Sequence, residues 1–408
     1  MPRALRSLLV LALLAGASPA LADAVDQACS TGTAEKRIPA CTKILDKVLA
    51  KSTRATVFYR RGLAYADKGD DAHAVEDFTA ALALRPRDAT TLGARADAFS
   101  RLDKTDQALA DYAGAIDADK SAPLPLINRG FALMDLDRDE DAIRDFSAAI
   151  DLDAHEAEAW KGRADAYRGL GNQIAALEDY EAALKIDKTY KNAYYGRARS
   201  YIDMKDYGHA LTDLQKAVEL DPEFDSGYFS RAYVRWQLGD TDGALEDYTK
   251  AIGLVTEFPA ARLERGQLFA SLKRYDLAMA DFDEAIRERP KDDSNWLSRG
   301  TTWRALGDYE KALSDIGKAI ELSPKRAEPY FERAKTNLLA QRLDEALADA
   351  DTAIGKDKDV ASYYETRAAI REQRKELDAA IADFRKALDL NHDAKTARAG
   401  LARLGAKP

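Results

Sequence analysis

Cysteine, histidine and long apolar runs are scarce in this chain, and each scarcity excludes a class of function. The 408 residues include two cysteines and only four histidines, which are His73, His155, His209 and His392. These histidines lie too far apart along the chain to assemble a local metal site. The sequence also lacks a glycine-rich phosphate loop, a nucleophile elbow and a paired-acid motif. We therefore expect no enzyme activity, no cofactor and no metal.

The one long apolar run lies at the N-terminus, in the segment MPRALRSLLVLALLAGASPALA. Arg3 and Arg6 precede the run, and Ala20-Leu21-Ala22 follows it, which is the layout of a secretory signal peptide. We expect residues 1–22 to be removed and the mature chain to be periplasmic or secreted. An uncleaved membrane anchor is the alternative, but the run falls short of the ~20 residues needed to span a bilayer.

Positive charge is not concentrated anywhere in the chain. The formal net charge is -9, and removal of Arg3 and Arg6 would bring it to about -11. A protein that binds phosphate backbones needs a basic stripe on its surface. Nucleic acid is therefore excluded as a partner, and no segment after the first 22 residues is apolar enough to span a membrane.

Cys29 and Cys41 both fall near the start of the expected mature chain. Disulfides persist in exported proteins, so we expect the two residues to pair. A bridge across so short a loop would stabilise the fold by ~2–4 kcal/mol. Two buried thiols or a redox pair are the alternatives, although eleven intervening residues do not fit the two-residue spacing of a thiol oxidoreductase.

A spacing of 34 residues governs the rest of the chain. An arginine recurs in the same setting at Arg61, Arg95, Arg129, Arg163, Arg197, Arg231, Arg265, Arg299, Arg333 and Arg367. Glycine or alanine follows each arginine, and two further alanine columns run from Ala74 to Ala380 and from Ala81 to Ala387. A large apolar residue recurs from Phe78 to Phe384, interrupted only by Ala350. A fixed period of this length indicates an array of stacked hairpins that share one core.

Each unit of the array is predicted to contain two amphipathic helices. In residues 55–88 apolar residues recur at three- and four-residue spacing in both halves, with Gly69-Asp70 between the halves. Small residues that face each other allow two antiparallel helices to approach closely. All eight prolines of the repeats fall after a second helix or in the first turn of a first helix, where proline is tolerated.

This pattern resembles the tetratricopeptide repeat. The family's spacing of aromatic and small residues is matched by Trp160, Ala164, Tyr167, Ala176 and Tyr180 in one unit, and by Trp296, Gly300, Trp303, Ala312 and Pro324 in another. The resemblance covers residues 55–394 as ten tandem 34-residue units, and the chain looks like an exported bacterial member. It implies an all-α, right-handed superhelical solenoid whose first helices line a concave groove.

The segments that flank the ten units are expected to close the array. Residues 23–54 look like a degenerate, Cys-linked N-terminal hairpin, because Ala28, Ala40 and Ile44 are in phase with the repeat. Residues 395–408 look like a capping helix, Lys395 to Leu404, followed by a tail.

The ten arginines stand where the family usually has an apolar residue. An aspartate precedes the large residue of every second helix, at Asp77, Asp111, Asp145, Asp179, Asp213, Asp247, Asp281, Asp315, Asp349 and Asp383. The match predicts bidentate structural pairs such as Arg231 with Asp247, either within a hairpin or between neighbours. A series of arginines that binds an acidic polymer is the alternative, but it would not need a carboxylate for every member.

Residues of the first helices that the resemblance places in the groove vary among the units. The candidates for partner binding are Tyr195, Arg199, Ile202, Phe229, Tyr233, Trp236 and Leu263, with a second cluster at Ile127, Phe131 and Met134. Aromatic residues in a groove are favoured anchors for a peptide, although they can equally pad the core.

Some family members grip a C-terminal carboxylate with a fixed set of Lys, Asn and Arg residues. That set is absent, because Lys161 is followed by Asp165 where Asn is needed, and Asn128 stands alone. Lys161, Arg168 and Arg199 form a weaker basic cluster that could meet an acidic segment or simply be solvated.

These observations predict an exported, non-enzymatic scaffold that binds protein or peptide partners. The partner's identity is not encoded in any motif. An assembly factor for an envelope or polysaccharide-export complex and a self-associating structural protein are the alternatives.

Overall fold

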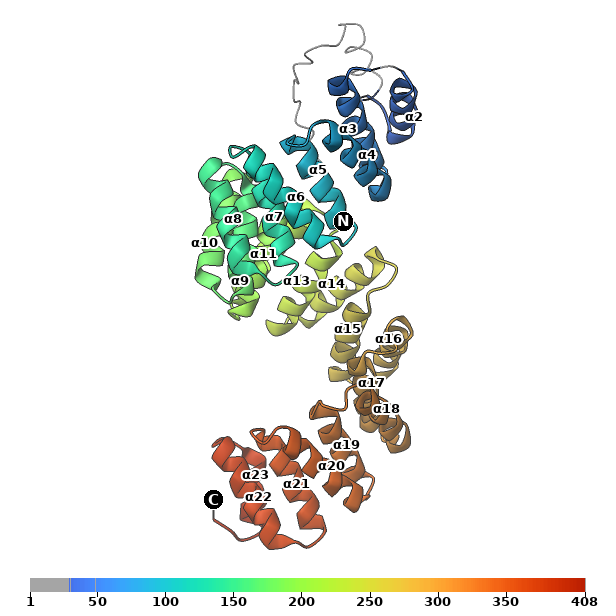
Figure 1. Cartoon of the computed structure of the whole chain (residues 1–408). Helices are drawn as coiled ribbons and strands as arrows, with labels where there is room; N and C mark the ends of the chain where they lie inside the picture. The colour runs from blue at the N-terminus through green and yellow to red at the C-terminus, as the bar shows by residue number, and fades with distance from the viewer. Residues whose placement is uncertain (1–28, 30, 48, 408) are drawn as a thin grey trace. The chain divides into compact units, whose positions relative to one another are not determined.

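The computed structural model describes residues 29, 31–47 and 49–407 of the chain. Within these residues the regular secondary structure consists of helices and no strand is present (Figure 1). The predicted signal peptide, residues 1–22, lies outside the described residues. No helix in the described part of the chain is long and apolar enough to cross a bilayer.

The chain divides into two compact units, Met1–Asp206 and Tyr207–Pro408. The described helices of the first unit are α2 (Ala34–Leu45), α3 (Lys51–Asp67), α4 (Asp71–Leu84), α5 (Ala89–Arg101), α6 (Thr105–Ala118), α7 (Pro123–Met134), α8 (Asp139–Leu152), α9 (Ala157–Gly169), α10 (Gln173–Ile186) and α11 (Lys191–Asp203). The helices of the second unit are α12 (Tyr207–Leu220), α13 (Asp225–Gln237), α14 (Thr241–Leu254), α15 (Pro259–Ser271), α16 (Tyr275–Glu288), α17 (Asp293–Ala305), α18 (Tyr309–Leu322), α19 (Glu328–Leu339), α20 (Leu343–Lys356), α21 (Ala361–Gln373), α22 (Leu377–Leu390) and α23 (Lys395–Arg403).

Local sequence fixes where the helices of a hairpin end and begin. Gly69 and Gly239 have φ of 81° and 83°, a left-handed conformation that ends a first helix at little cost for glycine. Asp70 and Asp240 follow them and accept a hydrogen bond from the backbone N–H three residues later, which caps the second helix. In these hairpins the turn is therefore encoded locally, whereas six others adopt the same left-handed conformation without glycine, at Asp103, Asp137, Lys205, Lys273, Gln341 and Lys375.

The small-residue columns lie where the helices meet. The alanines from Ala74 to Ala380 are wholly buried, and a Cβ atom built on Gly62 would lie 2.7 Å from the ring of Phe78. Gly266 would meet Phe282 at the same distance. The two helices of a hairpin are thus as close as their largest side chain permits, which is the close approach that the columns predict.

Consecutive first helices contact each other within each unit. In the first unit α7 packs on α9, and in the second α19 packs on α21, whereas consecutive second helices make no comparably close contact in the described residues. First helices are therefore more closely spaced than second helices, so they form the concave side of each stack.

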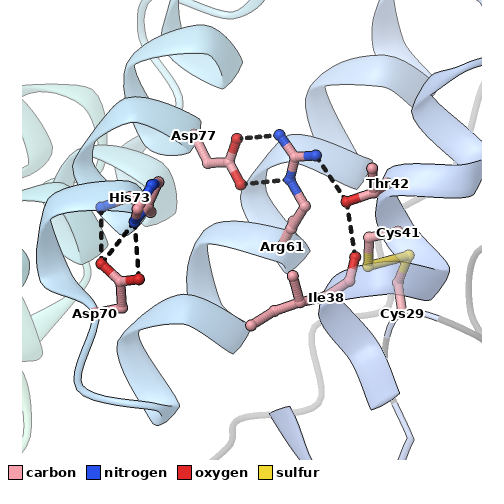
Figure 2. A network of polar contacts seen from close by, with 8 residues as sticks. All are labelled: Cys29, Ile38, Cys41, Thr42, Arg61, Asp70, His73 and Asp77. Carbon is pink, nitrogen blue, oxygen red and sulfur yellow. Dashed lines mark hydrogen bonds and ion pairs between the residues drawn. A yellow bond between two sulfur atoms is a disulfide. The ribbon is translucent and has the colours of Figure 1, made fainter. Parts of the chain in front are cut away.

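The first described helix, α2, is cross-linked to the segment before it and is held to the first repeat by polar contacts. Cys29 and Cys41 form a disulfide, as predicted. Arg61 on α3 donates to Thr42 on α2 at 2.9 Å, and Thr42 in turn donates to the carbonyl oxygen of Ile38 (Figure 2). Helix α3 begins at Lys51, four residues before the expected start of the first unit at Ala55. At the other end, α23 packs its buried Ala397 and Leu401 against the core of the last hairpin.

Candidate partner-binding surface

The arginine and aspartate columns form bidentate pairs inside single hairpins. In nine hairpins the arginine Nε and Nη2 atoms donate to the two carboxylate oxygens of the aspartate sixteen residues later, and for Arg231 with Asp247 the two distances are 2.8 and 2.7 Å. The tenth pair, Arg197 and Asp213, has its members in different units. The sequence left open whether the pairs form within a hairpin or between neighbouring hairpins, and nine pairs form within a hairpin.

The third guanidinium nitrogen of several of these arginines reaches the preceding hairpin. Nη1 donates to Thr79 from Arg95, to Ser147 from Arg163, to Thr249 from Arg265, to Asp283 from Arg299 and to Asp351 from Arg367. One arginine therefore ties the two helices of its own hairpin and also the hairpin before it. This arrangement leaves the guanidinium few donors for a ligand and supports a structural role.

Aromatic rings cover the same guanidinium groups. The guanidinium carbon of Arg163 lies 4.9 Å from the ring centre of Trp160, and that of Arg231 lies 5.2 Å from Tyr228. The hydrogen bonds that Arg231 donates to Asp247 raise the pKa of Arg231, although burial opposes the shift. The arginine column is therefore charged and enclosed, while its aspartate partners are almost completely buried.

The predicted binding residues of the first unit differ in accessibility. Arg199 on α11 is exposed and its guanidinium carbon lies 6.0 Å from the ring centre of half-buried Tyr195, and Ile202 is also half-buried. Phe131 and Met134 on α7 are half-buried against a core cluster. The first helices carry all five residues.

Ile127 was wrongly predicted to line the groove. Its side chain is 1% exposed and lies in the core cluster around Phe146. Ile127 lies four residues before Phe131, so the two residues share only roughly the same face of α7. The small difference in direction around the helix axis places Ile127 in the hairpin core, where burial of an isoleucine is favourable.

The weaker basic cluster is largely neutralised. Lys161 forms an ion pair with Asp165 at 2.5 Å, and Arg168 lies 3.7 Å from Asp203. The ammonium of Lys161 also lies 5.5 Å from the ring centre of Phe131. Of the three basic residues, Arg199 offers the most exposed charge.

In the second unit, α13 presents the densest group of aromatic side chains on a first helix. Phe229 is half-buried, with its ring centre 5.8 Å from Tyr248 and 5.2 Å from Phe258. Tyr233 and Trp236 are half-buried on the same helix, and Leu263 is half-buried on α15. Phe229 is consistent with both interpretations of these aromatics, partner binding and core packing, because it packs on the core and is only half-buried.

Sequence reasoning missed a set of polar contacts behind this surface. Tyr112 donates its hydroxyl to Asp97 at 2.6 Å, and Tyr180 donates to Asp165, each acceptor lying fifteen residues earlier on the first helix. Tyr248 is the third tyrosine of that column, but Tyr233 stands fifteen residues before it. The Tyr248 hydroxyl is buried and has no hydrogen-bond partner among the described residues. Reading the two columns together would have revealed this mismatch.

The same region holds a carboxylate without a counterion. Glu264 on α15 is half-buried and forms no ion pair or hydrogen bond through its side chain in the part of the chain that the structure describes. Burial raises the pKa of Glu264. Burial is also the main cause that raises the pKa of Tyr248 and of Tyr233, and the charge of Glu264 adds to both shifts. Glu264 therefore lies within electrostatic range of both tyrosines.

Comparison with known proteins agrees with the repeat architecture. Models described as tetratricopeptide repeat match residues 55–88, 128–191, 192–224, 229–293, 297–361 and 361–393. None of the curated protein sequences matches the chain.

Several solved structures are similar in fold. A tetratricopeptide repeat protein from Parabacteroides merdae is 20% identical, with a TM-score of 0.50 over 61% of this chain and 98% of that chain. PilW, described as a type IV pilus biogenesis factor, is 19% identical, with a TM-score of 0.49 over 52% and 98%. Yeast Tom70 is 19% identical, with a TM-score of 0.48 over 95% and 94%. The repeat spacing, the helical hairpins and the family matches agree: this chain belongs to the tetratricopeptide repeat family and folds as an all-α solenoid of such repeats.

Proposed function

We propose that the chain is a non-enzymatic scaffold that binds an extended segment of a partner protein on its first-helix face, outside the cytoplasm. The tetratricopeptide fold is a scaffold for protein–protein interaction, and the location and the binding residues are the finer parts of this proposal. The observation that carries it is the contrast between columns: the arginine, aspartate and alanine positions repeat, whereas half-buried positions of the first helices differ from one repeat to the next.

Helix α13 is the proposed centre of binding in the second unit. Its half-buried Phe229, Tyr233 and Trp236 present rings on a first helix, with Leu263 on the next first helix along the chain. Rigid aromatic side chains lose little conformational entropy when they are covered, so they make efficient anchors for a peptide. In the first unit, Tyr195, Arg199 and Ile202 on α11 and Phe131 and Met134 on α7 are the corresponding proposed contacts.

The disulfide supports the proposed location. Cys29 and Cys41 are bonded, and structural disulfides persist in oxidising compartments rather than in the cytosol. The signal-like segment at residues 1–22 points the same way.

Affinity capture from the exporting compartment, followed by mass spectrometry, tests the binding surface. We expect a Phe229→Ala, Trp236→Ala double variant to lose most of the captured partner, because both rings are removed from α13. A matched control on a second helix is Lys216→Ala with Glu219→Ala, whose side chains are exposed and pair only with each other on α12. Circular dichroism establishes that both variants are folded, and undiminished capture by the double variant would exclude α13 as the binding surface.

A further inference from the structure

Tyr207, Tyr233, Tyr248 and Glu264 form a group of polar side chains in the second unit, called the Glu264 cluster. Among the described residues, its buried Tyr248 hydroxyl has no hydrogen-bond partner and its half-buried Glu264 carboxylate has no counterion. A buried hydroxyl that lacks a hydrogen bond costs ~1–3 kcal/mol. Two unsatisfied polar groups side by side thus need an explanation that folding alone does not supply.

Repeat geometry places Glu264 directly against Tyr248. Gly196 occupies the same repeat position as Glu264, two repeats earlier, and a Cβ atom on Gly196 would lie 2.7 Å from the hydroxyl of Tyr180. Tyr180 and Tyr248 are themselves equivalent, since 68 residues separate each pair. A side chain at position 264 therefore starts beside the Tyr248 ring, in agreement with the effect of the Glu264 charge on the pKa of Tyr248.

Glu332 shows what a carboxylate at this position does when the array supplies a counterion. It lies two repeats after Glu264 and binds Arg304 at 2.6 Å and Lys335 at 3.2 Å. The residues equivalent to those two cations, 68 positions earlier, are Trp236 and Gln267. The Glu264 site thus has the acceptor but neither of the internal cations.

Aromatic rings take the place of the missing cations. The ring centres of Tyr207 and Tyr233 are 6.3 Å apart in an edge-on arrangement, and Trp236 follows Tyr233 on α13. Burial, followed by the neighbouring Tyr207 side chain, raises the pKa of Tyr233. A carboxylate with aromatic rings nearby provides both attractions that a desolvated ammonium or guanidinium group requires.

The C-terminal end of α14, beside this cluster, carries fewer capping hydrogen bonds than the ends of the other second helices in the described residues. At most junctions an Asp or Asn ends the second helix and its side chain accepts a backbone N–H two residues later, as Asp221 does from Glu223 and Asp357 from Asp359. Arg85, Val255, Arg289 and Ser323 stand at that position at the other four junctions. Among the described residues, Val255 alone of these four also lacks the backbone hydrogen bond to the carbonyl oxygen four residues earlier. In the second unit, α13 and α15 make a weaker contact than any later pair of consecutive first helices. The cluster therefore lies where neighbouring first helices are least tightly packed.

We propose that the Glu264 cluster binds a basic side chain, lysine or arginine, of the partner segment that lies on the first-helix face. The inference rests on the proposed function and specifies the chemistry of the partner. The cation forms an ion pair with the Glu264 carboxylate, contacts the rings of Tyr233 and Trp236, and donates a hydrogen bond to the Tyr248 hydroxyl. It occupies the role that Arg304 and Lys335 fill for Glu332 inside the array. The net charge of -9 favours a basic segment over an acidic one.

A peptide library with defined central residues tests this inference. The probes are pools of acetylated and amidated ten-residue peptides with one fixed central residue, lysine, arginine, norleucine or glutamate, and random residues elsewhere. We expect the wild-type chain to retain the lysine and arginine pools at least about five-fold more than the norleucine pool. This ratio corresponds to a difference of about 1 kcal/mol in binding free energy.

Two variants and two matched controls make the test specific. Glu264→Gln should abolish the preference for lysine and arginine, and Tyr248→Phe should reduce it. Glu332→Gln and Tyr180→Phe change the equivalent residues elsewhere in the array and should leave the preference intact.

The outcomes separate the two proposals. Equal retention of the lysine and norleucine pools, or a preference that survives Glu264→Gln, overturns the basic side-chain inference and leaves the binding scaffold standing. If the wild-type chain retains none of the pools, the inference fails together with the proposal that the first-helix face binds extended segments.

Discussion

The hairpins α9–α10 and α13–α14 are built on the same plan but differ in one polar contact. Both contain a buried tyrosine on the second helix and a bidentate arginine–aspartate pair. In the first hairpin Tyr180 donates to Asp165, whose position is occupied by Tyr233 in the second. One replacement thus turns a satisfied hydroxyl into an unsatisfied one. A repeat therefore tolerates a tyrosine hydroxyl without a partner among the described residues, because its arginine–aspartate pair and its buried alanines still hold the two helices together.

Removal of the paired arginine should produce the largest effect and should expose a difference between the hairpins. Arg163→Ala leaves Asp179 buried without a cation, and we expect a loss of ~3–5 kcal/mol in the free energy of unfolding. Arg231→Ala should also lower the melting temperature, but by less, because Arg235 stays 3.1 Å from Asp247. Urea unfolding followed by circular dichroism measures both. An unchanged melting curve for either variant would contradict the structural role of the pairs.

Removal of the tyrosine hydroxyls should separate the hairpins next. Tyr180→Phe deletes a hydrogen bond to a carboxylate and should cost ~1–2 kcal/mol of unfolding free energy. Tyr248→Phe deletes a hydroxyl without a partner among the described residues and should leave stability unchanged or slightly raised. Thermal melts of the two variants in one buffer give the comparison directly. Equal losses would show that the Tyr248 hydroxyl is satisfied in solution.

Replacement of the two equivalent glutamates should give small effects of opposite sign. Glu332→Gln removes the charge that holds Arg304 and Lys335, so it should lower the melting temperature. Glu264→Gln removes a carboxylate that has no counterion in the described residues, so it should raise the melting temperature at neutral pH.

The pH dependence of stability sharpens the same comparison. Burial raises the pKa of Glu264 in the folded chain above its value in the unfolded chain, with Tyr207, Tyr233 and Tyr248 as the nearby titratable groups. The folded state therefore holds the proton more tightly. The contribution of this group is fully present below the unfolded pKa and is lost as the pH rises through the raised, folded pKa.

The difference between wild type and Glu264→Gln should accordingly grow as the pH rises from about 4 towards 7. Melting temperatures across that range provide the measurement. A difference that stays constant would show that the pKa of Glu264 is the same in the folded and unfolded states.

Much of the fold could be predicted because its determinants are local and repeated. The column of alanines from Ala74 to Ala380 predicts close helix contact, and each of these alanines is buried. Gly69 and Asp70 predict the turn and the cap that the structure contains. The disulfide between Cys29 and Cys41 was also predictable, since only two cysteines exist and they lie close in sequence.

The candidate site could be predicted only in outline. Periodicity selected α13 as an aromatic first helix, but it also selected Ile127, which is buried. Three- and four-residue spacing locates the apolar face of a helix only approximately. Residues at the edge of that face can lie either in the core or on the surface. Glu264 escaped notice because its isolation depends on Trp236 and Gln267, which lie on two different helices.

The sequence by itself determined the 34-residue period, the glycine turns such as Gly69 and the small-residue contacts, because each depends on residues within one turn or one hairpin. Only the tertiary structure decided that Arg231 binds Asp247 within its own hairpin, that Ile127 is buried and that Glu264 has no counterion. These outcomes depend on which side chains of neighbouring helices meet. Electrostatic pairing and burial act across space, so they become visible only when the helices are packed.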